Sequence, residues 1–163
     1  MRTLNILLLN WRCWLNPQMG GAEVFTREVC TRLVKFGHNI TLFTSMYPLA
    51  KDEETCEGIH IVRAGGKYSV YRQARKAYLE RFSKEKFDVI IDEINTKPFF
   101  APKFVSHGEK VIALIHQLAR EYWFYEAPFG VRHIGYHFLE NLWLKQYVNV
   151  PTITVSNSTK SDL

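Results

Sequence analysis

The stretch LNILLLNWRCWLNPQMGGAEVF, residues 4–25, decides the fold prediction. Its apolar run LNILLLN is typical of a buried strand, and a loop then leads to Gly20 and Gly21. A helical pattern follows over residues 21–36, with Glu23 in its first turn. Strand, glycine-containing loop and helix together form the repeating unit of α/β folds.

Further apolar runs alternate with helical patterns along the rest of the chain. Strands are predicted at 39–45, 59–64, 88–92, 110–116 and 152–156, with a charged loop ahead of 59–64. Helices are predicted at 69–84, with an apolar face of Val70, Ala74, Ala77 and Tyr78, and in a short segment whose first turn holds Pro98. Continuously apolar strands indicate a sheet covered on both faces, hence parallel. The sequence predicts a doubly wound, Rossmann-like α/β domain with helices on both faces of a mostly parallel sheet.

Composition sets wide limits on function. The 163 residues have the length of one domain, and 47% of them are hydrophobic, which is enough for a core. The net charge of +5 suits an anionic ligand, a phospholipid surface or nucleic acid without selecting one. Cys13, Cys30 and Cys56 lack C-x-x-C spacing and are expected to be reduced thiols of a cytoplasmic protein. The first apolar run is too short for a signal peptide, and no run has the length of a membrane span.

Two other segments bear on organisation. In SNSTKSDL, Thr159 and Asp162 have capping-box spacing, so a helix is expected to start where the sequence stops, as in the front part of a longer protein. The segment 69–86 is a basic amphipathic helix. Such a helix can lie on the inner face of an anionic membrane as a peripheral contact, or can simply be a solvated outer helix. No nucleic-acid-binding module is recognisable, and nucleic acid is not expected as a partner.

Ligands of open α/β sheets bind at the carboxyl ends of the strands, so the residues that follow each strand are the candidates. Gly20 and Gly21 could hold an anion with bare backbone amides at a helix N-terminus, or could serve a loop that needs positive φ. Neither the dinucleotide fingerprint nor the P-loop lysine is present.

The later strand ends supply polar and aromatic candidates. Asp92, Glu93 and Asn95 could accept hydrogen bonds from a hydroxylated substrate or could cap the next helix. His116 directly follows the apolar run VIALI, at the carboxyl end of a predicted strand, where the sheet opens to the cleft. The aromatic cluster at 122–125 lies between Glu121 and Glu126 and could stack on a sugar, contact lipid or pack as a lid. His133 and His137 share a helical face, but without a third ligand no metal site is expected.

Several of these segments together resemble one family. MGGAEVFTREVCTRLVKFGHNITLFTS, FDVIIDEINTKPFFAP, KVIALIHQLAREYWFYE and PTITVSNSTKSDL occur in the order seen in the N-terminal domain of family 4 retaining glycosyltransferases. The resemblance implies a GT-B fold, in which two Rossmann-like domains face each other across a cleft. Residues 1–163 would form the acceptor-side domain, and the nucleotide-sugar domain would lie outside this chain.

The resemblance also implies roles for the candidates. Gly20 and Gly21 would place their amides against the donor diphosphate, and His116 would be the catalytic residue that contacts the donor sugar. The acceptor-side candidates are Glu93, Asn95, Glu121 and Trp123. Members of the family are generally metal-independent, so no cofactor is expected. The partners would be a nucleotide sugar and a glycan, lipid or small-molecule acceptor, and the 163-residue chain alone is expected to fold but to transfer no sugar.

Two other functions remain open at this point. The chain could be a stand-alone Rossmann-like binding module for a phosphorylated ligand or an anionic membrane surface. A nucleotide-dependent epimerase or dehydrogenase is disfavoured by the missing fingerprint and the missing Tyr-x-x-x-Lys.

Overall fold

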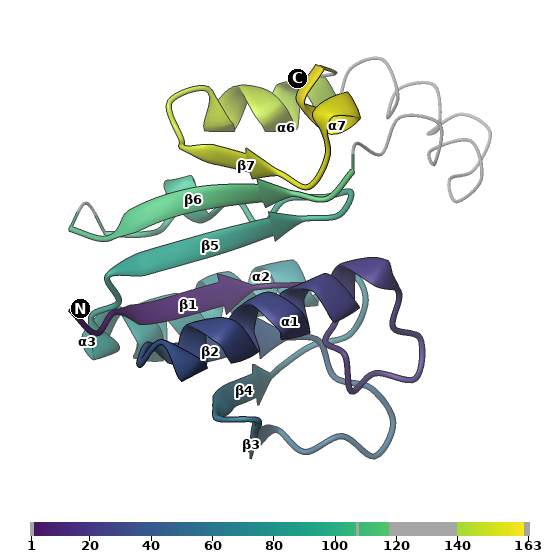
Figure 1. Ribbon diagram of the computed structural model, residues 1–163, viewed down its shortest axis with the longest axis vertical. Helices are drawn as coiled ribbons and strands as arrows, with labels where there is room; N and C mark the ends of the chain where they lie inside the picture. Colours follow the sequence, from purple (N-terminus) through teal and green to yellow (C-terminus); the bar gives the residue numbers. More distant parts are fainter. Residues whose placement is uncertain (1, 107, 118–139, 162–163) are drawn as a thin grey trace.

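The computed structural model describes residues 2–106, 108–117 and 140–161, which form one α/β unit around a seven-stranded sheet (Figure 1). The sheet order is β3-β4-β2-β1-β5-β6-β7, and every neighbouring pair is parallel except β3 and β4. The strands are β1 Asn5–Leu9, β2 Asn39–Thr44, β3 Glu53–Cys56, β4 Ile59–Arg63, β5 Val89–Ile94, β6 Lys110–Ile115 and β7 Thr152–Thr154.

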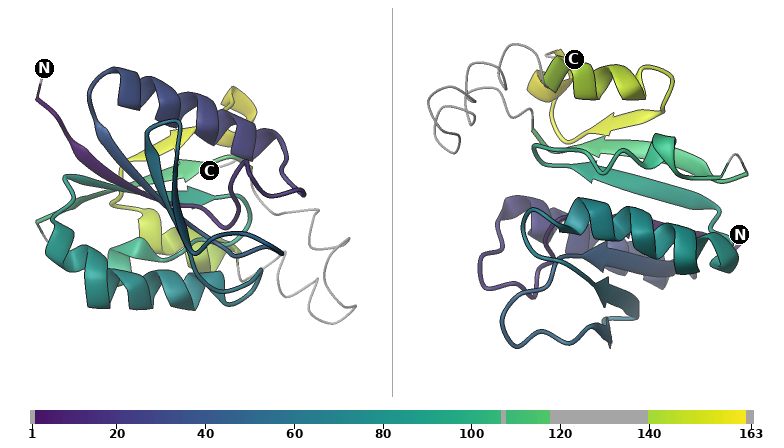
Figure 2. Two further views of the ribbon diagram at one scale, coloured as in Figure 1. Left: turned by 90° about the horizontal axis from the view of Figure 1, so that it is seen from below. Right: turned by 180° about the vertical axis from the view of Figure 1, so that it is seen from behind.

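Helices cover both faces of this sheet. They are α1 Gly21–Lys35, α2 Val70–Ala77 with its continuation through the π-helical η1 Tyr78–Phe82 into α3 Ser83–Glu85, the 3₁₀ turns η2 Ala101–Lys103 and η4 Lys145–Tyr147, α6 Glu140–Leu144, and α7 Asn157–Ser161. Figure 2 shows α1 on one face and α2 with α6 on the other. The predicted doubly wound, Rossmann-like fold is confirmed.

The alternation of side chains along β1 explains why that strand is apolar throughout. Ile6 and Leu8 pack in the core cluster that contains Cys30 of α1, whereas Leu7 and Leu9 pack in the cluster on the α2 side. Successive residues of a strand point to opposite faces, so a strand buried on both sides needs apolar residues at every position. Each such side chain contributes about 1.5–3 kcal/mol of apolar burial.

The sheet has a topological switch point between β1 and β5. The chain builds outward from β1 through β2 and β4, and then returns to place β5 on the other side of β1, with Leu9 in register with Asp92. Connections therefore leave these two strands in opposite directions, which opens a crevice at their carboxyl ends. The candidate site is built at this point.

The charged segment ahead of β4 is a strand rather than the expected loop. β3 pairs antiparallel with β4 through a two-residue turn at Glu57 and Gly58, both at positive φ. A Cβ on Gly58 would lie 2.8 Å from the Val34 side chain, so the turn needs glycine for space as well as for conformation. β3 is an edge strand with half its side chains in solvent, and its charged composition is typical of such edges.

Two helix starts differ from the expectation. The segment at Pro98 is not yet helical: Asp92 accepts hydrogen bonds from the amides of Phe99 and Ala101, and the helical turn η2 starts only at Ala101. α7 starts at Asn157, since the Ser156 hydroxyl accepts the Thr159 amide at 3.1 Å. The N-terminal cap is therefore Ser156 and not Thr159, and Asp162 lies outside the described residues.

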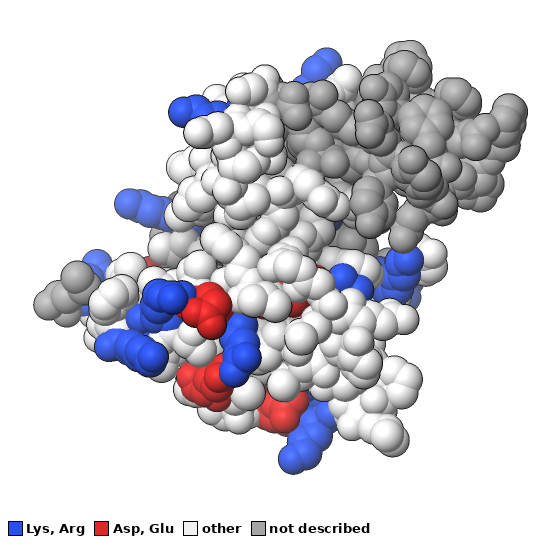
Figure 3. Space-filling view, turned by 45° about the vertical axis from the view of Figure 1, so that its right-hand side comes forward, with Lys and Arg blue, Asp and Glu red and all other residues white. Residues whose placement is uncertain are grey.

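The basic helix is partly neutralised by ion pairs. Arg81 bonds to Glu53 and Glu85, whereas Arg72 and Arg75 are exposed. Charges of both signs are also interspersed on the face drawn in Figure 3. Membrane contact through residues 69–86 stays a prediction. Among the described residues, no helix has both the length and the apolar character needed to cross a bilayer.

Candidate functional site

A buried polar cluster lies at the carboxyl ends of β1, β5 and β6. The Glu93 side chain on β5 is fully buried, and its Oε2 accepts hydrogen bonds from Asn10 Nδ2 at 2.5 Å and from the Thr26 hydroxyl at 2.7 Å. Nε2 of His116 lies 3.4 Å from the same oxygen, and the His116 side chain is 7% exposed. Groups from three strand ends and helix α1 thus meet at one carboxylate oxygen.

Helix α1 is held against this cluster by two contacts. Thr26, in its second turn, reaches Glu93, and the ring of Phe25 meets the His116 ring edge-on with centroids 5.4 Å apart. The His116 backbone is fixed as well, because its amide donates to the Ile94 carbonyl at 3.0 Å. These contacts bring the second turn of α1 next to His116, one turn from the two glycines at the start of the helix.

The two glycines differ in what their amides can do. Gly20 is the N-cap of α1, with φ −131°, and its amide donates to Glu23 Oε2 at 2.5 Å. Glu23 is itself buried, and its carboxylate lies 3.3 Å from the Arg12 guanidinium. The Gly20 amide is therefore already hydrogen-bonded within the protein. Of the two glycines, Gly21 is thus the better candidate to bind an external anion through its amide.

Neither glycine is required by the local backbone. Gly20 is extended, Gly21 is the first helical residue, and neither has positive φ. A Cβ at Gly21 would meet nothing within 4 Å, and one at Gly20 would make only ordinary contacts. Positive φ, the structural explanation considered for these glycines, does not account for them.

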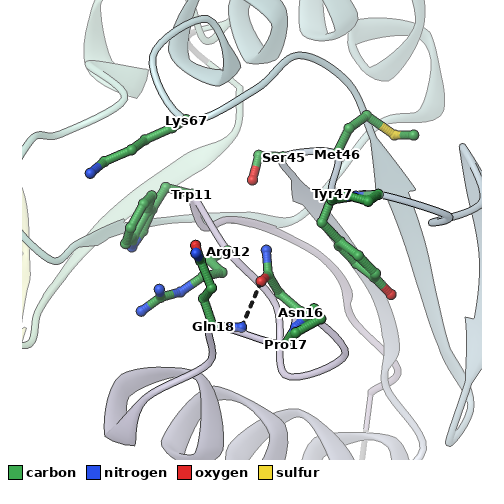
Figure 4. A pocket seen from close by; sticks show the side chains of 10 residues that line it. Trp11, Arg12, Asn16, Pro17, Gln18, Ser45, Met46, Tyr47 and Lys67 are labelled. Carbon is green, nitrogen blue, oxygen red and sulfur yellow. Dashed lines mark hydrogen bonds between the residues drawn. The ribbon is translucent and has the colours of Figure 1, made fainter.

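A cavity of about 320 Å³ lies between the loops after β1, β2 and β4 (Figure 4). Its lining residues are Trp11, Arg12, Asn16, Pro17, Gln18, Ser45, Met46, Tyr47, Pro48 and Lys67. In Figure 4, Trp11 and Lys67 lie on one side and Tyr47 on the other. Aromatic rings with a few amide, hydroxyl and cationic groups suit a small polar ligand with an apolar face.

Asp92, the neighbour of Glu93, serves a different part of the molecule. Its carboxylate is fully buried and accepts the amides of Phe99 and Ala101, each at 3.0 Å, and the Tyr147 hydroxyl. Burial raises the pKa of Asp92 above its ordinary value of 3.8, and the three hydrogen bonds oppose that rise. With all its contacts inside the fold, Asp92 holds the loop after β5.

The predicted site residues fall into three groups. Glu93 and His116 meet in the buried cluster, and Asn95 joins its edge, with Nδ2 3.4 Å from Asn10 Oδ1. Gly20 and Gly21 stand at the start of α1. Glu121 and Trp123 lie outside the described residues, as do His133 and His137.

Asn10 and Thr26 of the buried cluster were not singled out from the sequence, nor were residues that line the cavity, among them Trp11, Arg12 and Tyr47. The segment NWRCW directly after the first strand was the available signal for Asn10, Trp11 and Arg12, because it places polar and aromatic groups at a strand's carboxyl end. Thr26 lies inside a helix and gave no such signal. Within the described ranges, no group of three histidine, cysteine or acidic side chains is arranged to hold a metal ion.

A solved structure shares the architecture. The chain is similar to sucrose-phosphate synthase from Thermosynechococcus elongatus, with a TM-score of 0.57 and 14% identity, over 94% of this chain and 48% of that one. It is less similar to the C-terminal domain of the Coenzyme A biosynthesis bifunctional protein CoaBC, with a TM-score of 0.46 and 10% identity, over 71% of this chain and 64% of that one. The chain thus spans about half the length of the synthase. At 14% identity the likeness to the synthase concerns the fold alone.

Sequence comparison identifies the family. No curated protein matches the chain. A profile of Glycosyltransferase Family 4 matches residues 19–163. The matched region includes both glycines at the start of α1, the β5 strand with Glu93, and His116. Because the match covers most of the sequence, the chain belongs to glycosyltransferase family 4.

Proposed function

We propose that the protein takes part in transferring a sugar from a nucleotide-sugar donor to an acceptor, with retention of the anomeric configuration. The observation that carries this proposal is the convergence of the α1 N-terminus and His116 at the switch point of the sheet, through the Phe25 and Thr26 contacts. A helix N-terminus favours a diphosphate, and a histidine beside it is in place to contact the attached sugar. Family membership supports the reaction class.

In this proposal the chemistry is electrostatic. The leaving diphosphate gains negative charge as the glycosidic bond breaks, and the Gly21 amide together with the positive end of α1 stabilises that charge. His116 is the catalytic residue, since it contacts the donor sugar. The second half of the donor site belongs to a further domain, so the 163-residue chain alone transfers no sugar. No metal is required.

The acceptor is proposed to bind in the cavity between the loops after β1, β2 and β4. Trp11 and Tyr47 offer apolar rings, and Asn16 and Ser45 offer hydrogen-bonding groups. Asn95, Glu121 and Trp123 are proposed as further acceptor-side residues.

The proposal is tested by a donor screen. The full-length protein and the 163-residue chain are each incubated with a panel of nucleotide sugars and glycan, lipid and small-molecule acceptors, with and without EDTA. The expected result is transfer by the full-length protein only, unchanged by EDTA, with a product whose anomeric coupling in NMR matches that of the donor. An inverted product would contradict the mechanism, and transfer by the short chain would contradict the assignment of the donor site.

Gly21→Ala separates ligand binding from folding. Because Gly21 is exposed and a Cβ there meets nothing within 4 Å, the variant should be as stable as the wild type or slightly more so. The methyl group would stand where the diphosphate approaches, so kcat/KM for the donor is expected to fall roughly 100-fold. Gly108→Ala, an exposed glycine with equally open surroundings, is the control. Equal activity in both variants would remove Gly21 from the donor site.

Trp11→Leu tests the acceptor cavity. The leucine keeps apolar packing but removes the ring that faces the cavity, so KM for the acceptor is expected to rise about tenfold. The KM for the donor should stay unchanged. Phe36→Leu, a change at an exposed aromatic residue at the far end of α1, should alter neither constant. A rise in donor KM alone would place the donor in this cavity instead.

A further inference from the structure

Three polar groups of the protein converge on a single oxygen of Glu93. Asn10 Nδ2, the Thr26 hydroxyl and His116 Nε2 lie 2.5, 2.7 and 3.4 Å from Oε2. They come from the end of β1, from α1 and from the residue after β6. The Thr26 hydroxyl also lies 2.9 Å from the Ala22 carbonyl, but it has one hydrogen, and the shorter contact to a charged acceptor is the stronger one.

The burial of Glu93 places it behind the site and not in contact with a substrate. Its side chain has no exposed surface. The groups that it binds are protein groups, and each belongs to an element that ends at the crevice. A buried carboxylate of this kind can affect a ligand only through the residues that it holds.

The surroundings of His116 favour the tautomer of its imidazole that carries the proton on Nε2. Nε2 is buried and makes no hydrogen bond within the part of the chain that the structure describes; the charged Oε2 atom of Glu93 lies 3.4 Å from it. A proton on Nε2 lies near the carboxylate and is attracted by its charge, although the N–H is not aligned for a hydrogen bond at 3.4 Å. A lone pair on Nε2 would instead face a negative oxygen in a buried space, which is unfavourable.

We propose that Glu93 is a positioning residue for His116. In this role the ring turns slightly from its 3.4 Å approach, and the carboxylate then accepts a hydrogen bond from the Nε2–H group and fixes the ring. Asn10 and Thr26 hold the carboxylate in place. The other ring nitrogen, Nδ1, then carries a lone pair and accepts a hydrogen bond from a hydroxyl of the donor sugar. This role rests on the proposed function, and it gives Glu93 a place behind the catalytic residue instead of one on the acceptor side.

The primary test is NMR of His116 in the full-length protein, which needs no turnover. Wild type should show the Nε2-protonated tautomer, with a slowly exchanging, downfield imidazole proton. In Glu93→Gln the acceptor is neutral, so this resonance should move upfield and exchange faster. Tyr147→Phe is the matched control, because it removes a hydrogen bond to the other buried carboxylate of β5 and should leave the His116 resonance unchanged. An unchanged resonance in Glu93→Gln overturns the proposal.

Kinetics test the consequence for transfer. Glu93→Gln should lower kcat roughly 10- to 100-fold, the usual effect of losing an outer-shell partner, with little change in the acceptor KM. In a His116→Ala background the same substitution should have no further effect, and an additive loss would contradict action through His116. A raised acceptor KM with unchanged kcat would instead indicate that Glu93 helps to bind the acceptor.

Failure of this inference and failure of the proposed function give different results. If the wild-type resonance behaves as expected but no donor is used, the pairing of Glu93 and His116 stands and the proposed function fails. If Glu93→Gln does not fold, the His116 resonance is measured in Thr26→Val instead. That variant removes one donor to Oε2 at constant volume and should also weaken the downfield shift, and an unchanged resonance there overturns the proposal.

Discussion

Replacement of His116 by alanine is expected to lower kcat by roughly 100- to 10,000-fold, the range over which a positioned catalytic side chain contributes. The imidazole is the polar side chain at the end of β6 that lies next to both helix α1 and the Glu93 carboxylate. Removing it takes away the proposed contact with the donor sugar while the helix N-terminus stays in place. The loss should therefore appear in kcat more than in the KM for the donor.

The experiment must separate chemistry from folding, because the His116 side chain is 7% exposed. Turnover is measured well below the unfolding temperature of the variant, and its folded fraction is checked by circular dichroism. His60→Ala is the matched control: it removes a half-buried imidazole from β4 that pairs with Glu53 at the edge of the sheet. Wild-type turnover by folded His116→Ala would remove His116 from catalysis.

The fold was predictable because its strands are buried on both faces. Runs such as LNILLLN and VIALI leave no polar face to expose, and a parallel sheet between helices is the architecture that buries them. β3 was missed for the opposite reason. It is an edge strand in which Glu53 and Thr55 are exposed and Glu54 pairs with Arg63, so its composition is that of a loop, and only the Glu57–Gly58 turn indicated a hairpin.

The positions of the candidate site residues in the fold were predictable, but the contacts between their side chains were not. The rule that ligands bind at strand carboxyl ends pointed to Gly20, Glu93 and His116. It could not show that Asn10 reaches a carboxylate 83 positions away, or that Glu23 would occupy the Gly20 amide. The contact between Asn10 and Glu93 depends on the order and register of β1 and β5, which no local pattern encodes. The contact between Glu23 and Gly20 is local, three residues apart, and has the spacing of a capping box.

Adjacent residues of β5 show this limit most clearly. Asp92 and Glu93 look equivalent in the sequence, but successive side chains of a strand point to opposite faces. Glu93 meets Thr26 of α1 on one face, whereas Asp92 meets Tyr147 on the other. One carboxylate therefore supports the candidate catalytic residue, and the other supports the fold.

Asp92→Ala is expected to lower the free energy of unfolding by roughly 3–5 kcal/mol, because each of the three donors that lose their acceptor costs about 1–3 kcal/mol and water entering the space recovers part. These donors are the amides of Phe99 and Ala101 and the Tyr147 hydroxyl. A loss of this size is a large share of the 5–15 kcal/mol by which domains are typically stable. Urea unfolding measures it, and Asp52→Ala, at an exposed aspartate, should stay within about 0.5 kcal/mol of wild type.

The pH dependence of this loss tests the cause of the Asp92 pKa shift. Burial is the largest contribution and raises the pKa of Asp92 above 3.8, so the folded state binds the proton more tightly than the unfolded state does. The contribution of Asp92 to stability is then fully present below pH 3.8 and declines as pH rises through the folded-state pKa. Burial next to Asp92 also raises the pKa of Tyr147, so its hydroxyl remains a donor throughout this range.

The decisive quantity is the difference in unfolding free energy between wild type and Asp92→Ala at each pH, because groups that titrate in both chains cancel from it. It should be largest below pH 3.8 and should shrink as the pH rises toward neutral. A difference that instead grows with pH would mean that the hydrogen bonds from Phe99, Ala101 and Tyr147 outweigh desolvation and lower the pKa of Asp92. The buried carboxylate would then stabilise the loop after β5 most strongly in its charged form.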